Sequence, residues 1–284
     1  MAKFRKAFVT GWPVNHSRSP IIHRYWLEQH GLLDSGDYVK HPCQPDELEA
    51  FVTGIGSNGF VGGNVTVPHK EAVFAFVKNP QPAAEALGAI NTIWMEEDEL
   101  QGTNTDGYGF LANLDDRHPN WDSADNRTKA ALVLGAGGAS RAVIYALLER
   151  GFSKVLIANR TLTRAQQLVE RFGPRCEAIA ISKVSADTCA PSIIVNTTSI
   201  GMNDGESPLD LSGFATDTIV HDIVYTPLMT PLLKQAEELG MPAIDGLGML
   251  LHQAVLGFEK WFGVRPQVDD ALRQLILDDL GETT

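Results

Sequence analysis

The sequence predicts an α/β protein built from two domains. From Lys129 onward, short apolar runs alternate with helical segments, as expected of a parallel sheet with crossover helices. The stretch 115–128 (DDRHPNWDSADNRT) is polar and lacks hydrophobic periodicity, which favours a linker. We therefore expect one α/β domain at residues 1–114 and a second domain at 115–248. The apolar helical pattern at 249–284 has no strand left to pair with, so we expect it to return to the first domain.

The first domain is predicted from short runs separated by turn residues. Pro20 suits the first turn of a helix that Ser19 caps and that Gly31 ends. Two apolar runs flank the acidic turn at 96–99 and predict a hairpin. The expected strands are 6–10, 38–42, 60–66, 90–95 and 100–105, and the other expected helices are 46–52, a helix from Pro68 and 106–114.

The second domain is predicted from an apolar run that recurs after each helical segment. The expected strands are 131–134, 155–158, 178–181, 193–196, 219–223 and 243–244, with helices mainly between them. Residues 249–262 and 268–280 predict the two final helices.

Composition excludes several classes of protein. The chain has 284 residues, a formal net charge of −12 and 44% hydrophobic residues. An acidic balance argues against a general binder of nucleic acid or of anionic membranes. The three cysteines are widely spaced and match neither a disulfide framework nor a metal motif. The N-terminal segment does not resemble a signal peptide and no window is apolar enough to span a membrane, so we expect a cytoplasmic protein without metal.

The sequence AALVLGAGGAS at 130–140 predicts a phosphate-binding turn. An apolar strand leads through Gly135, Gly137 and Gly138 into a helical pattern, so backbone N–H groups and a positive helix end meet at one place. Glycines allow a pyrophosphate to approach the backbone closely. An ordinary strand–helix turn is the alternative.

The next strand is followed by Asn159-Arg160-Thr161 and Arg164, with no acidic residue in the position that usually binds the ribose of NAD. Arginine can clamp a 2′-phosphate, which favours NADP as the cofactor. The alternative is that the two arginines simply lie on a solvated helix face.

Two charged residues are candidates for chemistry. Lys70 lies in the predicted first turn of a helix, where a cation is unfavourable, so it is either a plain surface lysine or a group that exchanges protons. Asp106 follows the hairpin and could simply cap a helix. Ser17 and Ser19 are equally explained as turn and cap hydroxyls. Spacing alone does not bring these residues together.

The chain resembles the shikimate dehydrogenase family over nearly its whole length. The matching pieces are G-x-P-x-x-H-S-R-S-P at 11–20, N-V-T-V-P-H-K at 64–70, G-A-I-N-T at 88–92, G-x-N-T-D-x-x-G at 102–109, G-A-G-G-A at 135–139, N-R-T at 159–161, N-T-T-S-I-G-M at 196–202 and D-G-L-x-M-L-x-x-Q at 245–253. Eight pieces in the order of the family make a chance resemblance very improbable.

The resemblance implies an N-terminal α/β domain that binds shikimate and a Rossmann-like domain that binds NADP, with the active site in the cleft between them. It implies that Lys70 and Asp106 form the catalytic proton-transfer pair. The implied substrate-binding residues are Ser17, Ser19, Thr66, Lys70, Asn91, Asp106, Tyr225 and Gln253. The implied cofactor-binding residues are Gly135, Ala136, Gly137, Gly138, Ala139, Asn159, Arg160, Thr161, Arg164, Ile223 and Gly246.

The implied reaction is the reversible, NADP-dependent reduction of 3-dehydroshikimate to shikimate, a step toward chorismate and the aromatic amino acids. Two alternatives stay open at this point: a quinate/shikimate dehydrogenase that uses NAD, and a catalytically silent regulator that binds NADP. The oligomeric state is open, with a homodimer as one option.

Overall fold

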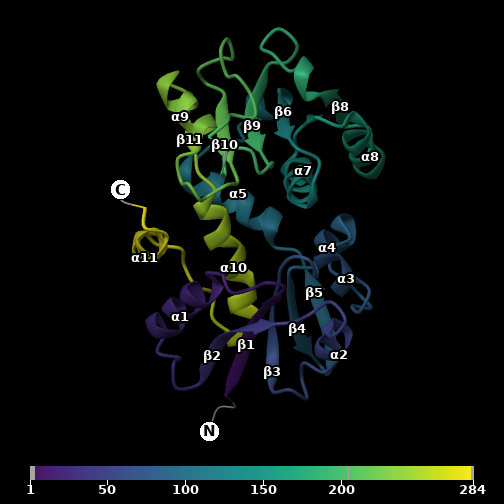
Figure 1. Cartoon of the computed structure of the whole chain (residues 1–284), viewed down its shortest axis with the longest axis vertical. Helices are drawn as coiled ribbons and strands as arrows, with labels where there is room; N and C mark the ends of the chain where they lie inside the picture. Colours follow the sequence, from purple (N-terminus) through teal and green to yellow (C-terminus); the bar gives the residue numbers. More distant parts are fainter. Residues whose placement is uncertain (1–3, 204, 283–284) are drawn as a thin grey trace. The chain divides into compact units, whose positions relative to one another are not determined.

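The computed structural model describes residues 4–203 and 205–282. Its internal contacts divide the chain into two units (Figure 1). One unit comprises the described residues up to Thr105 together with those from Leu251 onward, and the other comprises Asp106–Leu250. The divisions lie at the first residue of helix α5 (Asp106–Arg117) and within helix α10 (Leu247–Phe262).

The first unit contains a five-stranded sheet in the order β2-β1-β3-β4-β5. Strand β1 (Arg5–Gly11) pairs in parallel with β2 (Gly36–Pro42) and β3 (Phe60–Val65). The hairpin of β4 (Thr92–Glu96) and β5 (Glu99–Thr103) is antiparallel and joins the sheet beside β3. The carboxyl ends of β1 and β3 therefore lie at the same edge of the sheet as the start of β4.

Aromatic and aliphatic side chains form the core of this unit. Phe8 of β1 is fully buried and makes edge contacts with Phe51 and Phe60 at ring-centroid distances of 4.9 and 5.0 Å. Trp261 is 1% exposed and donates a hydrogen bond through Nε1 to the carbonyl of Ile93 at 2.9 Å. The helices of this unit are α1 (Ser19–Gln29), α2 (Leu48–Thr53), α3 (Lys70–Phe74), α4 (Pro82–Leu87), the later part of α10, and α11 (Asp270–Leu280).

The second unit contains a six-stranded sheet in the order β11-β10-β9-β6-β7-β8, and all its strand pairs are parallel. The chain starts in the middle at β6 (Ala130–Leu134), runs outward through β7 (Lys154–Asn159) and β8 (Cys176–Ala180), and then returns to β9 (Pro191–Asn196) beside β6. The strand order reverses between β6 and β9, and sheets of this kind bind ligands beyond the carboxyl ends of the strands at such a point. The remaining strands are β10 (Ile219–Asp222) and β11 (Ala243–Ile244).

Helices connect the parallel strands of the second unit. The longest of them, α7 (Gly138–Arg150), follows β6 and buries Val143, Ile144 and Leu147. Helices α8 (Leu162–Phe172) and α9 (Pro231–Glu238) also connect strands, whereas α5 and α6 (Ala124–Thr128) precede β6 and α10 begins after β11. A short 3₁₀ turn lies at Ile181–Lys183. In the part of the chain that the structure describes, no helix combines the length and the hydropathy needed to cross a bilayer.

The polar stretch at 115–128 is structured. It contains the end of α5 and the short helix α6, where Ser123 caps the helix by accepting a hydrogen bond from the backbone N–H of Asn126. Trp121 is 1% exposed, stacks on Phe152 at 5.7 Å between ring centroids, and lies beneath the guanidinium of Arg150. This one buried aromatic residue anchors a stretch that otherwise shows no periodicity.

Candidate active site

The hydroxyls of Ser17 and Ser19 lie in the loop that follows β1. The Ser17 hydroxyl donates to Ser19 Oγ at 3.2 Å, so the two are already side by side. Between them Arg18 turns to helix α11, where its Nε donates to the carboxylate of Asp279 at 2.9 Å. The guanidinium is thereby neutralised, and the loop presents hydroxyls rather than a free cation.

Asn91 lies just before β4, at the same edge of the sheet. Its Oδ1 accepts hydrogen bonds from the Thr92 hydroxyl at 2.9 Å and from the backbone N–H and hydroxyl of Thr105 at 2.9 and 3.1 Å. Its Nδ2 donates to Oε1 of Gln253 in α10 at 3.4 Å. Two residues that the sequence analysis assigns to the substrate are thus bonded to each other, although they lie 162 positions apart in the chain.

Lys70 is the first residue of α3, two positions later than the helix start predicted at Pro68. The preceding turn is held by the backbone N–H of His69, which donates to the carbonyl of Thr66 at 3.0 Å. The His69 ring is buried, and its Nε2 lies 2.8 Å from the carbonyl oxygen of Cys43. The carbonyl of Lys70 accepts from the N–H of Ile90 at 2.8 Å, which ties this residue to the segment that carries Asn91.

The predicted residues are divided between the two units. Ser17, Ser19, Thr66, Lys70, Asn91 and Gln253 belong to the first, whereas Asp106, Tyr225 and the predicted cofactor residues belong to the second. Asp106 directly follows Thr105, whose backbone and hydroxyl are bonded to Asn91.

The glycine turn after β6 fits a pyrophosphate. A Cβ atom on Gly137 or Gly138 would meet nothing within 4 Å, so the backbone there faces open space. Gly137 caps α7 without a side-chain hydrogen bond, and the first turn of α7 has no acidic residue. Gly135 has φ +111°, and a Cβ there would lie 2.7 Å from Thr197 Oγ1, so only glycine suits this position. Free N–H groups, a positive helix end and close access together suit an anion.

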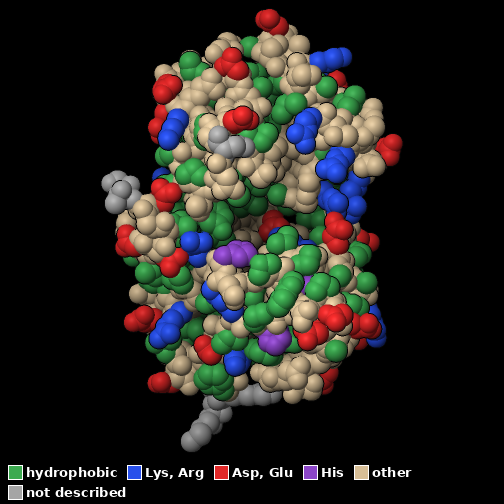
Figure 2. All heavy atoms as spheres, in the orientation of Figure 1, with side chains coloured by type: hydrophobic (Ala, Val, Ile, Leu, Met, Phe, Trp, Pro, Cys, Tyr) green, Lys and Arg blue, Asp and Glu red, His purple; other side chains and the backbone are tan. Residues whose placement is uncertain are grey.

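The carboxyl end of β7 presents cations. Asn159 donates through Nδ2 to the carbonyl of Thr161 at 2.8 Å, which fixes the turn into α8. Arg160, Thr161 and Arg164 are exposed, and the first turn of α8 has no acidic residue. Figure 2 shows Lys and Arg side chains gathered on the side of this unit that carries α7 and α8. These residues could therefore hold the 2′-phosphate of NADP.

Ile223 and Gly246 are in contact, because a Cβ on Gly246 would lie 2.3 Å from the carbonyl oxygen of Ile223. A glycine is required where the chain after β11 approaches the chain after β10. Tyr225 lies in this same segment after β10.

A buried carboxylate beneath these loops was missed by the sequence analysis. Asp222 is fully buried and accepts hydrogen bonds from Asn196 Nδ2 at 3.0 Å, the backbone N–H of Val224 at 3.0 Å and the Thr230 hydroxyl at 2.8 Å. Burial raises the pKa of Asp222, with the hydrogen bonds from Asn196, Val224 and Thr230 acting against this rise. The motif D-I-V-Y-T-P was the available signal, but its pattern gave no indication that the aspartate points inward.

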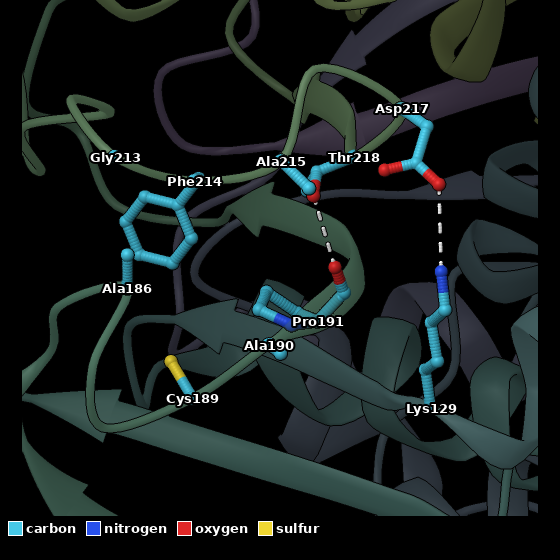
Figure 3. A pocket seen from close by; sticks show the side chains of 10 residues that line it. All are labelled: Lys129, Ala186, Cys189, Ala190, Pro191, Gly213, Phe214, Ala215, Asp217 and Thr218. Atoms are coloured by element: carbon cyan, nitrogen blue, oxygen red, sulfur yellow. Dashed lines mark hydrogen bonds and ion pairs between the residues drawn. The ribbon is translucent and has the colours of Figure 1, made fainter.

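A pocket of about 200 Å³ lies at the opposite edge of the second sheet, near the amino ends of β9 and β10 (Figure 3). Its Lys129 pairs with Asp217 at 3.4 Å, and the Thr218 hydroxyl donates to the carbonyl of Pro191 at 3.0 Å. It contains none of the predicted site residues. Across residues 4–203 and 205–282, no group of three or more His, Cys, Asp or Glu side chains is arranged to hold a metal ion.

Comparison with known proteins decides the family. Residues 9–93 match the shikimate dehydrogenase substrate-binding domain, residues 121–202 match shikimate/quinate 5-dehydrogenase, and residues 246–276 match the shikimate 5′-dehydrogenase C-terminal domain. A protein of Azorhizobium caulinodans named shikimate dehydrogenase (NADP(+)) is 54% identical over 278 residues, which cover 97% of each chain. The chain belongs to the shikimate dehydrogenase family. This confirms the resemblance drawn from the eight sequence motifs.

Solved structures of this family agree with the fold. The chain is 36% identical to shikimate 5-dehydrogenase of Thermus thermophilus in complex with NADP(H) and shikimate, with a TM-score of 0.82 over 96% of this chain and 100% of that one. It is 29% identical to quinate dehydrogenase of Corynebacterium glutamicum in complex with NAD, with a TM-score of 0.84 over 97% and 99% of the two chains. The predicted α/β architecture, with a substrate-binding domain and a Rossmann-like domain, is thereby confirmed.

Proposed function

We propose that this chain catalyses the reversible reduction of 3-dehydroshikimate to shikimate with NADPH. The observation that carries the proposal is the cluster at the carboxyl edge of the first sheet, where the Ser17–Ser19 and Asn91–Gln253 pairs are hydrogen bonded in a member of the shikimate dehydrogenase family. Such a cluster offers neutral donors and acceptors to a small polyhydroxylated acid.

Ser17 and Ser19 bind the carboxylate of the substrate in this proposal. Hydroxyl donors suit a carboxylate, and the pairing of Arg18 with Asp279 leaves this loop without an uncompensated cation. Thr66, Asn91, Gln253 and Tyr225 bind the ring hydroxyls. Three donors already occupy Oδ1 of Asn91, so its amide presents N–H groups to the substrate.

Lys70 and Asp106 transfer the proton in this proposal. When the ketone is reduced, the Lys70 ammonium donates a proton to the oxygen that becomes the new hydroxyl; in the reverse direction the pair accepts it. Asp106 favours the charged lysine and orients it.

NADPH, when bound, supplies the hydride. The N–H groups between Gly135 and Ala139 hold the pyrophosphate, and Asn159, Arg160, Thr161 and Arg164 hold the 2′-phosphate. Ile223 and Gly246 line the nicotinamide end in this proposal, because the segments after β10 and β11 lie in direct contact where Gly246 has no Cβ.

We further propose a cytoplasmic enzyme of aromatic amino acid biosynthesis, acting through chorismate. The net charge of −12 and the small-molecule site favour no nucleic-acid or membrane partner. A homodimer stays a hypothesis that sedimentation would test.

A crossed assay tests the proposed function. Shikimate and quinate are each combined with NADP and with NAD, and the absorbance of the reduced nicotinamide is followed. We expect the highest kcat/KM for shikimate with NADP, because Arg160 and Arg164 compensate the charge of the 2′-phosphate.

The other outcomes of this assay identify the alternatives. A preference for quinate and NAD would show that the chain acts like the C. glutamicum enzyme, which is similar over 97% of this chain. Binding of NADP without turnover of either acid would show a silent regulator. Either result would overturn the proposal.

A further inference from the structure

A series of hydrogen bonds, most of them partly buried, connects Tyr38 of β2 to the substrate residues of the first unit. The Tyr38 hydroxyl donates to Oδ1 of Asn64 at 2.7 Å. Asn64 Nδ2 in turn donates to the carbonyl of Asn91 and to the hydroxyl of Thr92, both at 3.2 Å. The Thr92 hydroxyl donates to Oδ1 of Asn91, which brings the series to the amide assigned to the substrate.

The donors in this series all point in one direction. Because Oδ1 of Asn64 accepts from Tyr38, its amino group faces Thr92. Thr92 then accepts from Asn64 and has its own proton free for Asn91. Asn91 therefore turns its amino group toward Gln253, whose Oε1 accepts from it. The backbone N–H of Thr105 also donates to Oδ1 of Asn91, so the hydrogen bonds that begin at Tyr38 support the orientation of both amides and do not set it alone.

The surroundings of Tyr38 keep its hydroxyl protonated, so that it can donate a hydrogen bond. Tyr38 is 5% exposed, and burial raises its pKa well above the ordinary value, although hydrogen bonds with Ser19 and Asn64 oppose the rise. The ring of His23 stacks on the Tyr38 ring at 4.0 Å between centroids. His23 is fully buried and desolvation lowers its pKa to about 3, so it is neutral near pH 7 and places no charge against the phenol.

Tyr38 also lies near the other half of the site. Hydrogen bonding by Ser19, which the proposed function assigns to the substrate carboxylate, acts to lower the pKa of the same phenol. The phenol therefore lies near the serine loop after β1 as well as bonding to Asn64.

We propose that Tyr38 is a positioning residue for substrate recognition. Its hydroxyl holds the amide of Asn64, which supports the arrangement of the Asn91 and Gln253 amides, so that N–H donors face the hydroxyls of a polyhydroxylated cyclic acid. This inference rests on the proposed function and adds a residue that does not itself touch the substrate.

Tyr38→Phe tests this inference, because it removes one oxygen atom and keeps the ring that stacks on His23. We expect KM for shikimate to rise about 3- to 10-fold, the range that one neutral hydrogen bond supports. KM for NADP and the pH dependence of kcat should stay unchanged.

Thr92→Val interrupts the same series of hydrogen bonds one step later. The double variant Tyr38→Phe/Thr92→Val should therefore lose no more shikimate affinity than the more affected single variant.

Tyr25→Phe is the matched control. Tyr25 also donates through its hydroxyl, to the carboxylate of Asp269 at 2.9 and 3.0 Å, but it takes no part in the series that leads to Asn91. We expect its KM for shikimate to stay within about 2-fold of the parent.

Three results would overturn the inference while the proposed function stands. They are an unchanged KM for shikimate in Tyr38→Phe, an equal rise of KM for shikimate and for NADP, and an effect of Tyr25→Phe as large as that of Tyr38→Phe. If the parent chain fails to oxidise shikimate at all, the proposed function fails and the inference falls with it.

Discussion

Replacing Lys70 by alanine is expected to lower kcat for shikimate oxidation by about 10²- to 10⁴-fold, the usual contribution of a positioned acid–base group. The variant should bind NADP with the affinity of the parent, because Lys70 belongs to the first unit and the glycine turn after β6 belongs to the second. Steady-state kinetics combined with NADP titration by fluorescence separates the two effects.

Lys78→Ala is the control for this variant. Lys78 is an exposed lysine of the same unit, eight positions further along the chain, and its removal should leave kcat unchanged. If Lys70→Ala kept the full kcat, Lys70 would be a plain surface lysine, and the acid–base role proposed for it would be wrong.

Arg160→Ala is expected to weaken NADP by about 10- to 100-fold, because hydrogen bonds to a charged group contribute about 1.5–3 kcal/mol. NAD lacks the 2′-phosphate, so its affinity should change by less than about 2-fold. The measurement is the KM of each cofactor at saturating shikimate, together with equilibrium titration of NADP.

Arg171→Ala provides the comparison, since Arg171 is an exposed arginine near the other end of α8. Arg171→Ala changes the net charge of the protein by the same amount as Arg160→Ala, but at a position away from the predicted 2′-phosphate site. Equal losses for NADP and NAD in Arg160→Ala would mean that this side chain does not recognise the 2′-phosphate.

Local sequence patterns were sufficient to predict most of the fold. The run Ala131 to Leu134 followed by glycines identified β6 and α7, because a buried parallel strand is apolar along its whole length. Helix α6 was missed, since it buries none of its residues and therefore shows no periodicity. Helix α4 was also missed, although Pro82 at its start and left-handed Gly88 at its end are typical signals of helix ends.

The site was predictable only in part. Residue types and family motifs indicated Ser17, Asn91 and Gln253, but only the structure shows that the Asn91 and Gln253 amides are bonded to each other. Tyr38 had no signal in the sequence, because a lone tyrosine in a strand looks like any core aromatic residue. Its proposed role comes from its contacts with His23 and Asn64 and from the bond of Asn64 to Thr92, which only the tertiary fold brings together.

The coupling between Lys70 and Asp106 tests the central claim most directly. The kcat for shikimate oxidation is measured in Lys70→Ala, Asp106→Asn and the double variant. If the two residues act as one proton-transfer pair, the double variant should lose about as much activity as the more damaged single variant, as catalytic groups that work together do. If the two losses instead multiply, the residues act independently, and the proposed pair is contradicted.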